Sequence, residues 1–387
     1  MTNEDYYNVF DQMIEDLQAD NRDGLTKVIS TIMNLSMRIE QEKALQASHY
    51  ERNDDRGGHR NGYKSRTLRT RVGEIPIEIP QVRGMEFYPG SIEKGCRSER
   101  SLKLAIAQMY IQGVSTRKVS KIVEQLCGFE VSQSQVSDAA AMLDEEISKW
   151  RERALGAFPY LILDATYEKT RVDRSVVSAA VLIAYGVDNS GMRRVLGIST
   201  ELSEASSHWR KFLSGLVDRG LHGVKMITSD AHSGLKAAIE AIFPTVPWQR
   251  CQFHLQQNAG HHVPKKTMAK RVFEDIRMIF NAPNENEARR FLAMTVKEYE
   301  KSAPELSEWM EVNIPESLTV FRMPRAHWRR LRTSNLAERQ MKEIKRRTRV
   351  AMIFPNKESV DRLVAALLME IDESWSTGKR YLNMETD

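Results

Sequence analysis

The chain has 387 residues, of which 41% are hydrophobic and 28% charged, a composition typical of globular proteins with two or three domains. Its formal net charge of +5 is too small to identify a partner. The three cysteines are too few and too scattered for a disulfide framework, which favours a reducing compartment. The sequence opens without a signal-peptide pattern and contains no apolar run near the roughly 20 residues that cross a bilayer. We therefore expect a cytoplasmic protein without membrane contact.

The distribution of charge says more than its total. Residues 1–48 carry nine acidic and four basic side chains, whereas residues 321–350 carry eleven basic and two acidic ones. A concentrated basic stripe is typical of nucleic-acid-binding surfaces, although a solvated helix face has the same composition.

The N-terminal third contains helical spacing followed by strand alternation. Apolar residues recur at helical intervals within residues 5–48, which predicts one or two amphipathic helices. Residues 49–66 are rich in Gly, Asn and charge and are interpreted as a linker. Alternation around Gly73 in residues 67–83 predicts a β-hairpin. The plausible DNA-phosphate contacts on its first half are Arg66, Arg69 and Arg71.

Two short helices with clear end signals follow the hairpin. Ser115 is expected to cap the first and Gly128 to end it, while Ser132 is expected to cap the second. The buried faces are predicted to contain Val119, Ile122, Val123 and Leu126, then Val136, Ala140 and Leu143. A helix-turn-helix has this form, and so does an ordinary helical hairpin. In the first interpretation the candidates for contacts to DNA bases are Gln133, Ser134 and Gln135.

From residue 158 the pattern changes to strands. Three apolar strands, a helix, a strand, a helix and a fifth strand, "VPWQRCQFH", make the element order of a ribonuclease-H-like fold. In that topology the first and fourth strands are neighbours, so Asp164 and Asp230 are expected side by side at the ends of these strands. Two adjacent carboxylates repel each other unless a cation lies between them, and Mg²⁺ is the hard cation that suits them.

A third carboxylate would complete a two-metal site for phosphodiester chemistry. Glu338 lies near the start of a predicted helix capped by Ser334 or Asn335, where the helix dipole favours an anion. Glu343, on the same helix, is a reserve candidate that is expected to point elsewhere. The basic residues of this helix that we expect to hold the DNA backbone are Arg339, Lys342, Lys345, Arg346 and Arg349.

Together these segments resemble the Mutator-type transposases of bacterial insertion sequences over nearly the whole chain. The similar stretches are "RNGYKSRTLRTRVGEIPIEIPQVR", "GVSTRKVSKI", "ILDATY", "ITSDAHSGLKAAI", "QRCQFHLQQN" and "TSNLAERQMKEIKRRTRVAMIFPN". The family's two aspartates and glutamate correspond to Asp164, Asp230 and Glu338, and its Cys-x-x-His signature to Cys251 and His254.

The resemblance implies a DDE transposase that binds the terminal inverted repeats of its element as double-stranded DNA. It would cut and join DNA strands with Mg²⁺, for which Mn²⁺ may substitute, by a copy-out, paste-in route. Target DNA is a further partner, and holding two ends implies at least a homodimer, nucleoid-associated when bound. The resemblance also implies a helical insertion before the Glu338 helix. No Gly-x-x-x-x-Gly-Lys run is present, so ATP is not expected.

The role of the Cys-x-x-His signature is less clear. Cys251 is interpreted as a buried residue on the fifth strand, with His254 at the end of that strand, near Asp230 and the scissile phosphate. A zinc site that also uses His261 and His262 is disfavoured, because structural zinc usually has two separated ligand pairs. Two other functions remain possible, a non-catalytic helix-turn-helix regulator and a structure-selective nuclease on the same fold.

The expected fold is a multidomain α/β protein, a ribonuclease-H-like mixed sheet with a helical insertion, preceded by helical and helix-turn-helix DNA-binding regions. The predicted regions are an N-terminal helical region (1–50), a basic linker and β-hairpin (51–92), a helix-turn-helix region (93–152), the first part of the core (153–255), a helical insertion (256–325) and the second part of the core with the glutamate helix (326–387).

Overall fold

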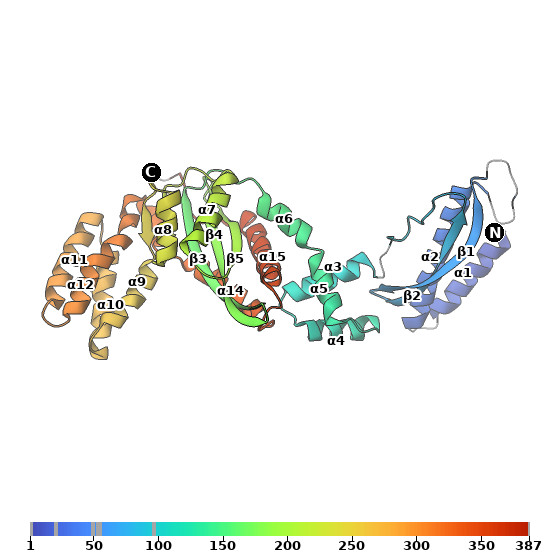
Figure 1. Ribbon diagram of the computed structural model, residues 1–387, viewed down its shortest axis with the longest axis horizontal. Coiled ribbons are helices and arrows are strands. Elements are labelled where there is room, and N and C mark those ends of the chain that lie inside the picture. Colours follow the sequence, from blue (N-terminus) through green and yellow to red (C-terminus); the bar gives the residue numbers. More distant parts are fainter. Residues whose placement is uncertain (1–2, 19–21, 48–50, 52–55, 95–97, 386–387) are drawn as a thin grey trace. The chain divides into compact units, whose positions relative to one another are not determined.

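The computed structural model describes residues 3–18, 22–47, 51, 56–94 and 98–385 and divides into two units, residues 1–142 and 143–387 (Figure 1). The chain is of the mixed α/β class that the sequence predicts. Cys96 lies outside the described residues. Among the described residues, we find no helix with the length and apolarity needed to span a membrane.

The first unit begins with two helices and a hairpin. These elements are α1 (Asn3–Gln18), α2 (Arg22–Leu45), β1 (His59–Thr70) and β2 (Gly73–Arg83). The inner face of β2 presents Ile75, Ile77 and Ile79, which pack with Met37 of α2 in an apolar cluster. The helices and hairpin expected from the sequence are therefore confirmed.

The predicted linker over residues 49–66 is wrong in its second half, because β1 begins at His59. The alternating apolar residues of β2 require a partner of matching length, and pairing runs from His59 opposite Arg83 to Thr70 opposite Gly73. The strand pairing shifts in register between Arg60 and Tyr63, where Gly62 has a φ of 75°, and this irregularity lets the Gly- and Asn-containing segment remain part of the strand.

Three helices complete the first unit, α3 (Arg100–Ile111), α4 (Thr116–Cys127) and α5 (Gln133–Ala141). The predicted end signals are confirmed. Ser115 and Ser132 accept hydrogen bonds from the backbone of the first turns, and Gly128 ends α4 in the left-handed conformation.

Two predicted buried residues of these helices are wrong. Leu126 is 66% exposed, and Cys127 takes the inward position instead, because it lies four residues after the buried Val123. Leu143 lies beyond the end of α5, which stops at Ala141.

The second unit is built on a five-stranded mixed sheet. Its strands are β3 (Tyr160–Val172), β4 (Ser175–Val187), β5 (Arg193–Glu201), β6 (Met226–Ser229) and β7 (Trp248–Arg250). Their order in the sheet is β5-β4-β3-β6-β7, with β3, β4 and β5 antiparallel and β6 and β7 parallel to β3. The expectation that the first and fourth strands are neighbours is confirmed.

Helices cover this sheet, and alternation along β3 decides which side chains meet them. Leu161 and Leu163 pack in the apolar cluster that contains α7 (Ser206–Asp218) and α8 (Ser233–Ile242). Successive side chains of a strand point to opposite faces, so Asp164 lies on the other face. That face is also contacted by α14 (Asn335–Thr348), whose Thr348 donates a hydrogen bond to Glu168 of β3.

Helices account for the chain between β7 and α14, as the resemblance implies. They are α9 (Gln252–Ala259), α10 (Lys266–Phe280), α11 (Glu285–Tyr299), α12 (Pro304–Asn313) and α13 (Trp328–Leu331), with short 3₁₀ turns between them. Helices α9 to α12 share one apolar cluster. The remaining helices of the unit are α6 (Asp144–Glu152), before the sheet, and α15 (Lys357–Ser376), after α14.

A buried carboxylate holds α15 against the sheet. The side chain of Asp372 is 5% exposed and forms ion pairs with Arg153 at 3.1 Å and Arg194 at 2.9 Å. It also accepts hydrogen bonds from the backbone N–H of Val195 on β5 and from the indole N–H of Trp150 on α6. One carboxylate thus joins α6, β5 and α15.

We predict that Asp372→Ala lowers the free energy of unfolding by about 3 kcal/mol, because it leaves two half-buried guanidinium groups without their anion. The measurement is urea unfolding of the full chain. The matched control is Glu373→Ala, the adjacent exposed position on the same helix, with an expected change below about 0.5 kcal/mol. Equal losses in both variants would contradict the assignment.

Candidate active site

Asp164 and Asp230 lie at the same level on neighbouring strands. In the parallel pairing of β3 with β6, Tyr160 is opposite Met226 and Ile162 is opposite Thr228, so the same offset brings Asp164 level with Asp230. Asp230 follows the last residue of β6 directly. The predicted adjacency of the two carboxylates follows from this register.

The prediction that Asp164 ends its strand is wrong. β3 continues to Val172, because its antiparallel pairing with β4 extends eight residues past Asp164 to the Val172–Ser175 pair. Asp164 therefore lies within β3, at the level where the neighbouring strand β6 ends. Its side chain is 9% exposed, and one of its oxygens accepts a hydrogen bond from the backbone N–H of Ala165.

Glu338 is brought to this place by the start of α14. Ser334 occupies the N-cap position as predicted, but its side chain makes no capping hydrogen bond. Instead both its hydroxyl and its backbone N–H donate to the sulfur of Cys251, each at 3.3 Å. The N-cap position predicted for Ser334 is therefore confirmed, but the side-chain cap is absent because the sulfur of Cys251 takes the Ser334 hydroxyl.

The prediction that Cys251 lies on the fifth strand and His254 at its end is wrong. β7 ends at Arg250, Cys251 is the N-cap residue of α9, and His254 lies in the first turn of that helix. The physical reason is the period of the buried residues, since Gln252, Leu255 and Ala259 follow at helical spacing. Cys251 is fully buried, and its backbone N–H donates to the carbonyl oxygen of Ser229 at the end of β6.

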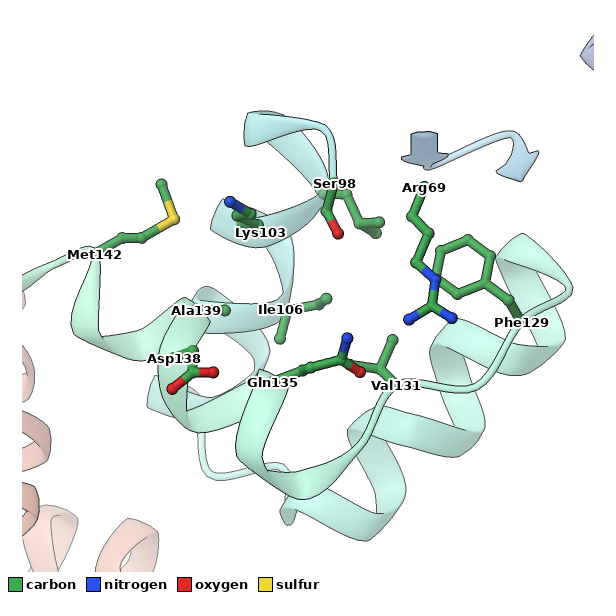
Figure 2. Close-up of a pocket in the computed structure, with 11 residues that line it drawn as sticks. Arg69, Ser98, Lys103, Ile106, Phe129, Val131, Gln135, Asp138, Ala139 and Met142 are labelled. Carbon is green, nitrogen blue, oxygen red and sulfur yellow. The ribbon is translucent and has the colours of Figure 1, made fainter. Parts of the chain in front are cut away.

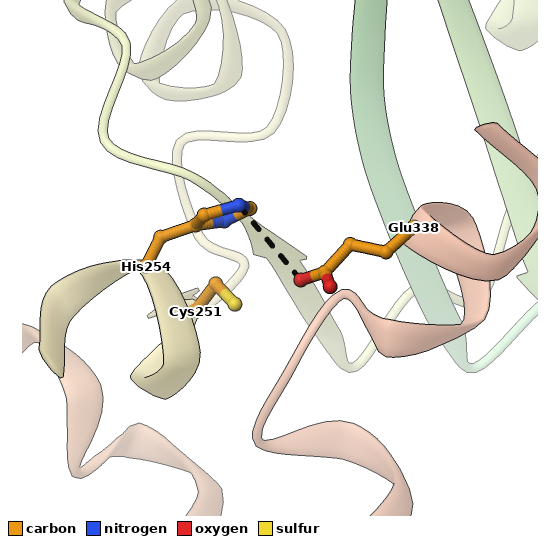
Figure 3. A group of neighbouring side chains, drawn as sticks. All are labelled: Cys251, His254 and Glu338. Carbon is orange, nitrogen blue, oxygen red and sulfur yellow. Dashed lines mark ion pairs between the residues drawn. The ribbon is translucent and has the colours of Figure 1, made fainter. Parts of the chain in front are cut away.

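The signature residues and the glutamate form one cluster (Figure 3). His254 Nε2 lies 3.8 Å from Glu338 Oε1, and one ligand atom from each of Cys251, His254 and Glu338 lies within 4.8 Å of the others. His254 Nδ1 and Glu338 Oε1 are buried atoms without a hydrogen-bond partner among the described residues. Sequence reasoning missed this cluster, since Glu338 is brought to Cys251 and His254 by contacts such as the Ser334–Cys251 hydrogen bond, which joins residues 83 apart.

Two residues of this region, Asp164 and His254, have raised pKa values. Burial, followed by the charge of Asp230, raises the pKa of Asp164 to about 7, and the charge of Glu338 acts in the same direction. Interaction with the Cys251 sulfur, followed by the charges of Glu338 and Asp164, raises the pKa of His254 to about 9. Asp230, His254 and Glu338 each lie close enough to Asp164 to affect its pKa.

Glu343 points elsewhere, as expected. It forms ion pairs with Arg346 and Arg347 on its own helix, both at 2.8 Å, and Arg346 above all lowers its pKa to about 2. Glu343 therefore has its own cations, whereas the ion pair found for Glu338 among the described residues is with His254. The exposed basic residues of α14 and its C-cap are Arg339, Lys342, Lys345, Arg346 and Arg349.

The other candidate DNA contacts belong to the first unit. Arg69 is paired with Glu74 at 3.0 Å and Arg71 with Glu99 at 3.3 Å, while Arg66 lies at the middle of β1. Figure 2 shows the Arg69 guanidinium beside the ring of Phe129, 5.3 Å from its centroid, in a pocket of about 270 Å³ that Gln135 also lines. Gln133 and Ser134 are exposed in the first turn of α5. The side chain of Gln135 accepts a hydrogen bond from the backbone N–H of Ser132 in the capping box of α5, so one of its hydrogen-bonding groups is already used within its own helix.

The chain belongs to the Mutator family of transposases, because residues 1–378 match the sequence model of that family. It is 52% identical to the transposase of insertion sequence element IS406 from Burkholderia multivorans, covering 93% of this chain and 94% of that protein. It is 43% identical to the ISRM5 transposase of Rhizobium meliloti, covering 96% and 94% of the two chains. Identity to the IS256 transposase in Tn4001 of Staphylococcus aureus is 35%, with 94% of each chain covered.

The raised pKa of Asp164 predicts a pH-dependent cost in the metal-free protein. The folded state binds this proton more tightly than the unfolded state, so stability falls as the pH rises from about 4 to about 7. Asp164→Asn removes this pH dependence. When the pH is raised from acid to about 8, the wild type should therefore lose on the order of 3 kcal/mol more of its free energy of unfolding than the variant does. Urea unfolding with a chelator present measures this. Parallel pH profiles for the two proteins would contradict it.

Proposed function

We propose that the protein is a DDE transposase with a ribonuclease-H-like catalytic core, in which Asp164, Asp230 and Glu338 hold divalent metal ions. The observation that supports the proposal is that Asp230, which follows β6, and Glu338, in the first turn of α14, both contribute by their charge to the raised pKa of Asp164 on β3. The sheet order β5-β4-β3-β6-β7 supports the fold assignment.

The residues fit Mg²⁺, for which Mn²⁺ is a plausible substitute. Glu338 Oε1 is a buried oxygen without a hydrogen-bond donor among the described residues, and burial, followed by the charge of Asp230, raises the pKa of Asp164. Carboxylate oxygens on rigid elements are the ligands that this hard ion takes. When bound, the ions would activate water or a 3′-hydroxyl and stabilise the charge on the phosphate oxygens.

The chain's own side chains would position DNA for this chemistry. A pKa of about 9 keeps His254 cationic at neutral pH, which puts a positive charge next to Glu338 where a scissile phosphate would approach. Along α14 the exposed lysines and arginines would contact the DNA backbone beyond that point. Repulsion between Glu338 and DNA would be offset by the bound ions.

The first unit would recognise the ends of the element. The exposed first turn of α5 supports a helix-turn-helix in which Gln133, Ser134 and Gln135 contact bases, with Arg66, Arg69 and Arg71 of the hairpin on phosphates. Synapsis of two ends requires at least a dimer. The partners are thus the inverted repeats and target DNA, and the copy-out, paste-in route is the family's route applied to this chain.

We predict that Glu338→Gln abolishes Mg²⁺-dependent nicking and strand joining on a duplex that carries DNA flanking the gene. Losing a ligand of ions that contribute several kcal/mol should slow the reaction by at least about a thousand-fold. The matched control is Glu343→Gln, the other glutamate of α14, which should retain nicking because Arg346 and Arg347 already neutralise it. Gel assays of labelled strands measure both products.

Different outcomes of that assay separate the alternatives. Binding without cutting by the wild type would support the regulator, and cutting without joining would support the nuclease. Loss of activity in Glu343→Gln but not in Glu338→Gln would show that the wrong glutamate has been assigned.

We predict that DNA affinity falls steeply with salt, because phosphate contacts release counterions. Lys342→Ala and Lys345→Ala should each lower the slope of log affinity against log salt by about 0.9. Arg346→Ala should lower it less, since Glu343 already pairs with this side chain. Fluorescence anisotropy at several salt concentrations measures the slopes. A flat salt response would contradict the role of α14.

A further inference from the structure

The sulfur of Cys251 has the surroundings of a metal-binding thiolate. It is fully buried and accepts two hydrogen bonds from Ser334, one from the backbone N–H and one from the hydroxyl. Donors of this kind stabilise a negatively charged sulfur and orient it, as the outer partners of metal ligands commonly do. The proposed Mg²⁺ chemistry makes no use of this sulfur, because Mg²⁺ takes oxygen ligands.

Two further possible ligand atoms beside that sulfur lack a hydrogen-bond partner among the described residues, although Glu338 Oε1 lies 3.8 Å from His254 Nε2. These atoms are His254 Nδ1 and Glu338 Oε1, and a buried polar atom without a hydrogen bond is unfavourable. Cys251, His254 and Glu338 offer ligand atoms within 4.8 Å of one another. Figure 3 shows the three side chains converging from the start of α9 and the first turn of α14.

We propose that Cys251, His254 and Glu338 form a binding site for a thiophilic divalent cation such as Zn²⁺. Sulfur, nitrogen and oxygen ligands are the set that zinc accepts, at about 2.3 Å from sulfur and 2.0–2.2 Å from the other two atoms. Bringing the ligand atoms to one ion needs side-chain rotation within the cluster. Both ligands bind in their deprotonated forms, so binding releases the proton of the His254 imidazolium and the thiol proton of Cys251 to solvent, and it leaves a fourth position for water.

This site differs from a structural zinc site with four protein ligands. His262 stacks on Trp309 at 5.0 Å between ring centroids, and neither His261 nor His262 belongs to the cluster. The consequence is regulatory and rests on the proposed function. Because Glu338 belongs to both sites, a thiophilic ion would withdraw it from Asp164 and Asp230 and so hold the enzyme inactive.

Cobalt(II) is the probe, because a thiolate bound to Co²⁺ gives an intense near-ultraviolet charge-transfer band that oxygen ligands do not give. We expect the band in the wild type without DNA, and its loss in Cys251→Ser. The control is the double variant Cys96→Ser and Cys127→Ser, which removes the other two thiols and should keep the band. Absence of the band in the wild type, or its persistence in Cys251→Ser, overturns the site.

Glu338→Gln tests the shared ligand without disturbing the sulfur. It should keep a band but weaken Co²⁺ binding at least about ten-fold. Added Mg²⁺ should raise the apparent Co²⁺ dissociation constant of the wild type and leave that of Glu338→Gln unchanged. Equal Co²⁺ affinities in the two proteins, or no effect of Mg²⁺ on the wild type, would overturn the competition. None of these readouts requires DNA cleavage, so they are independent of the proposed transposase activity.

Discussion

The docking of the start of α14 against the ends of β6 and β7 is the constraint on which the site depends. Ser334 donates twice to Cys251, Gln252 donates from its backbone to the carbonyl of Arg332, and Thr228 of β6 donates to the carbonyl of Leu331. These bonds join residues that are at least 80 positions apart in the sequence. Without them Glu338 would have no fixed relation to Asp164 and Asp230, and the helices between β7 and α14 would separate the carboxylates.

Two glutamates on one helix illustrate how environment decides chemistry. Glu343 faces Arg346 and Arg347, so its charge is balanced within the helix. Glu338, five residues earlier, has an oxygen that is buried without a donor and a histidine 3.8 Å away. An anion inside a basic stripe is unfavourable for DNA unless a cation accompanies it. Glu338 is therefore the glutamate that we propose as a metal ligand. Because it also lies beside the buried sulfur of Cys251, we propose that it can bind thiophilic ions as well as Mg²⁺.

Patterns within a short window predicted much of the fold. Helix caps at Ser115 and Ser132 and the hairpin turn at Gly73 depend on neighbouring residues, and all three are present. Errors arose where a partner strand or helix decides the outcome. β1 begins at His59 because β2 needs a partner, β3 continues past Asp164 because β4 pairs with it, and Cys251 leaves the strand because α9 buries a helical face.

The sequence by itself determined the class of elements and the neighbouring strands at which Asp164 and Asp230 lie, since residue type, spacing and element order encode them, and it supplied Glu338 as a prediction. Tertiary structure alone decided that Cys251 contacts Ser334, that His254 faces Glu338, and that Asp164 carries a raised pKa. Burial and charge coupling depend on distances between residues far apart in the chain, and one-dimensional spacing does not contain those distances.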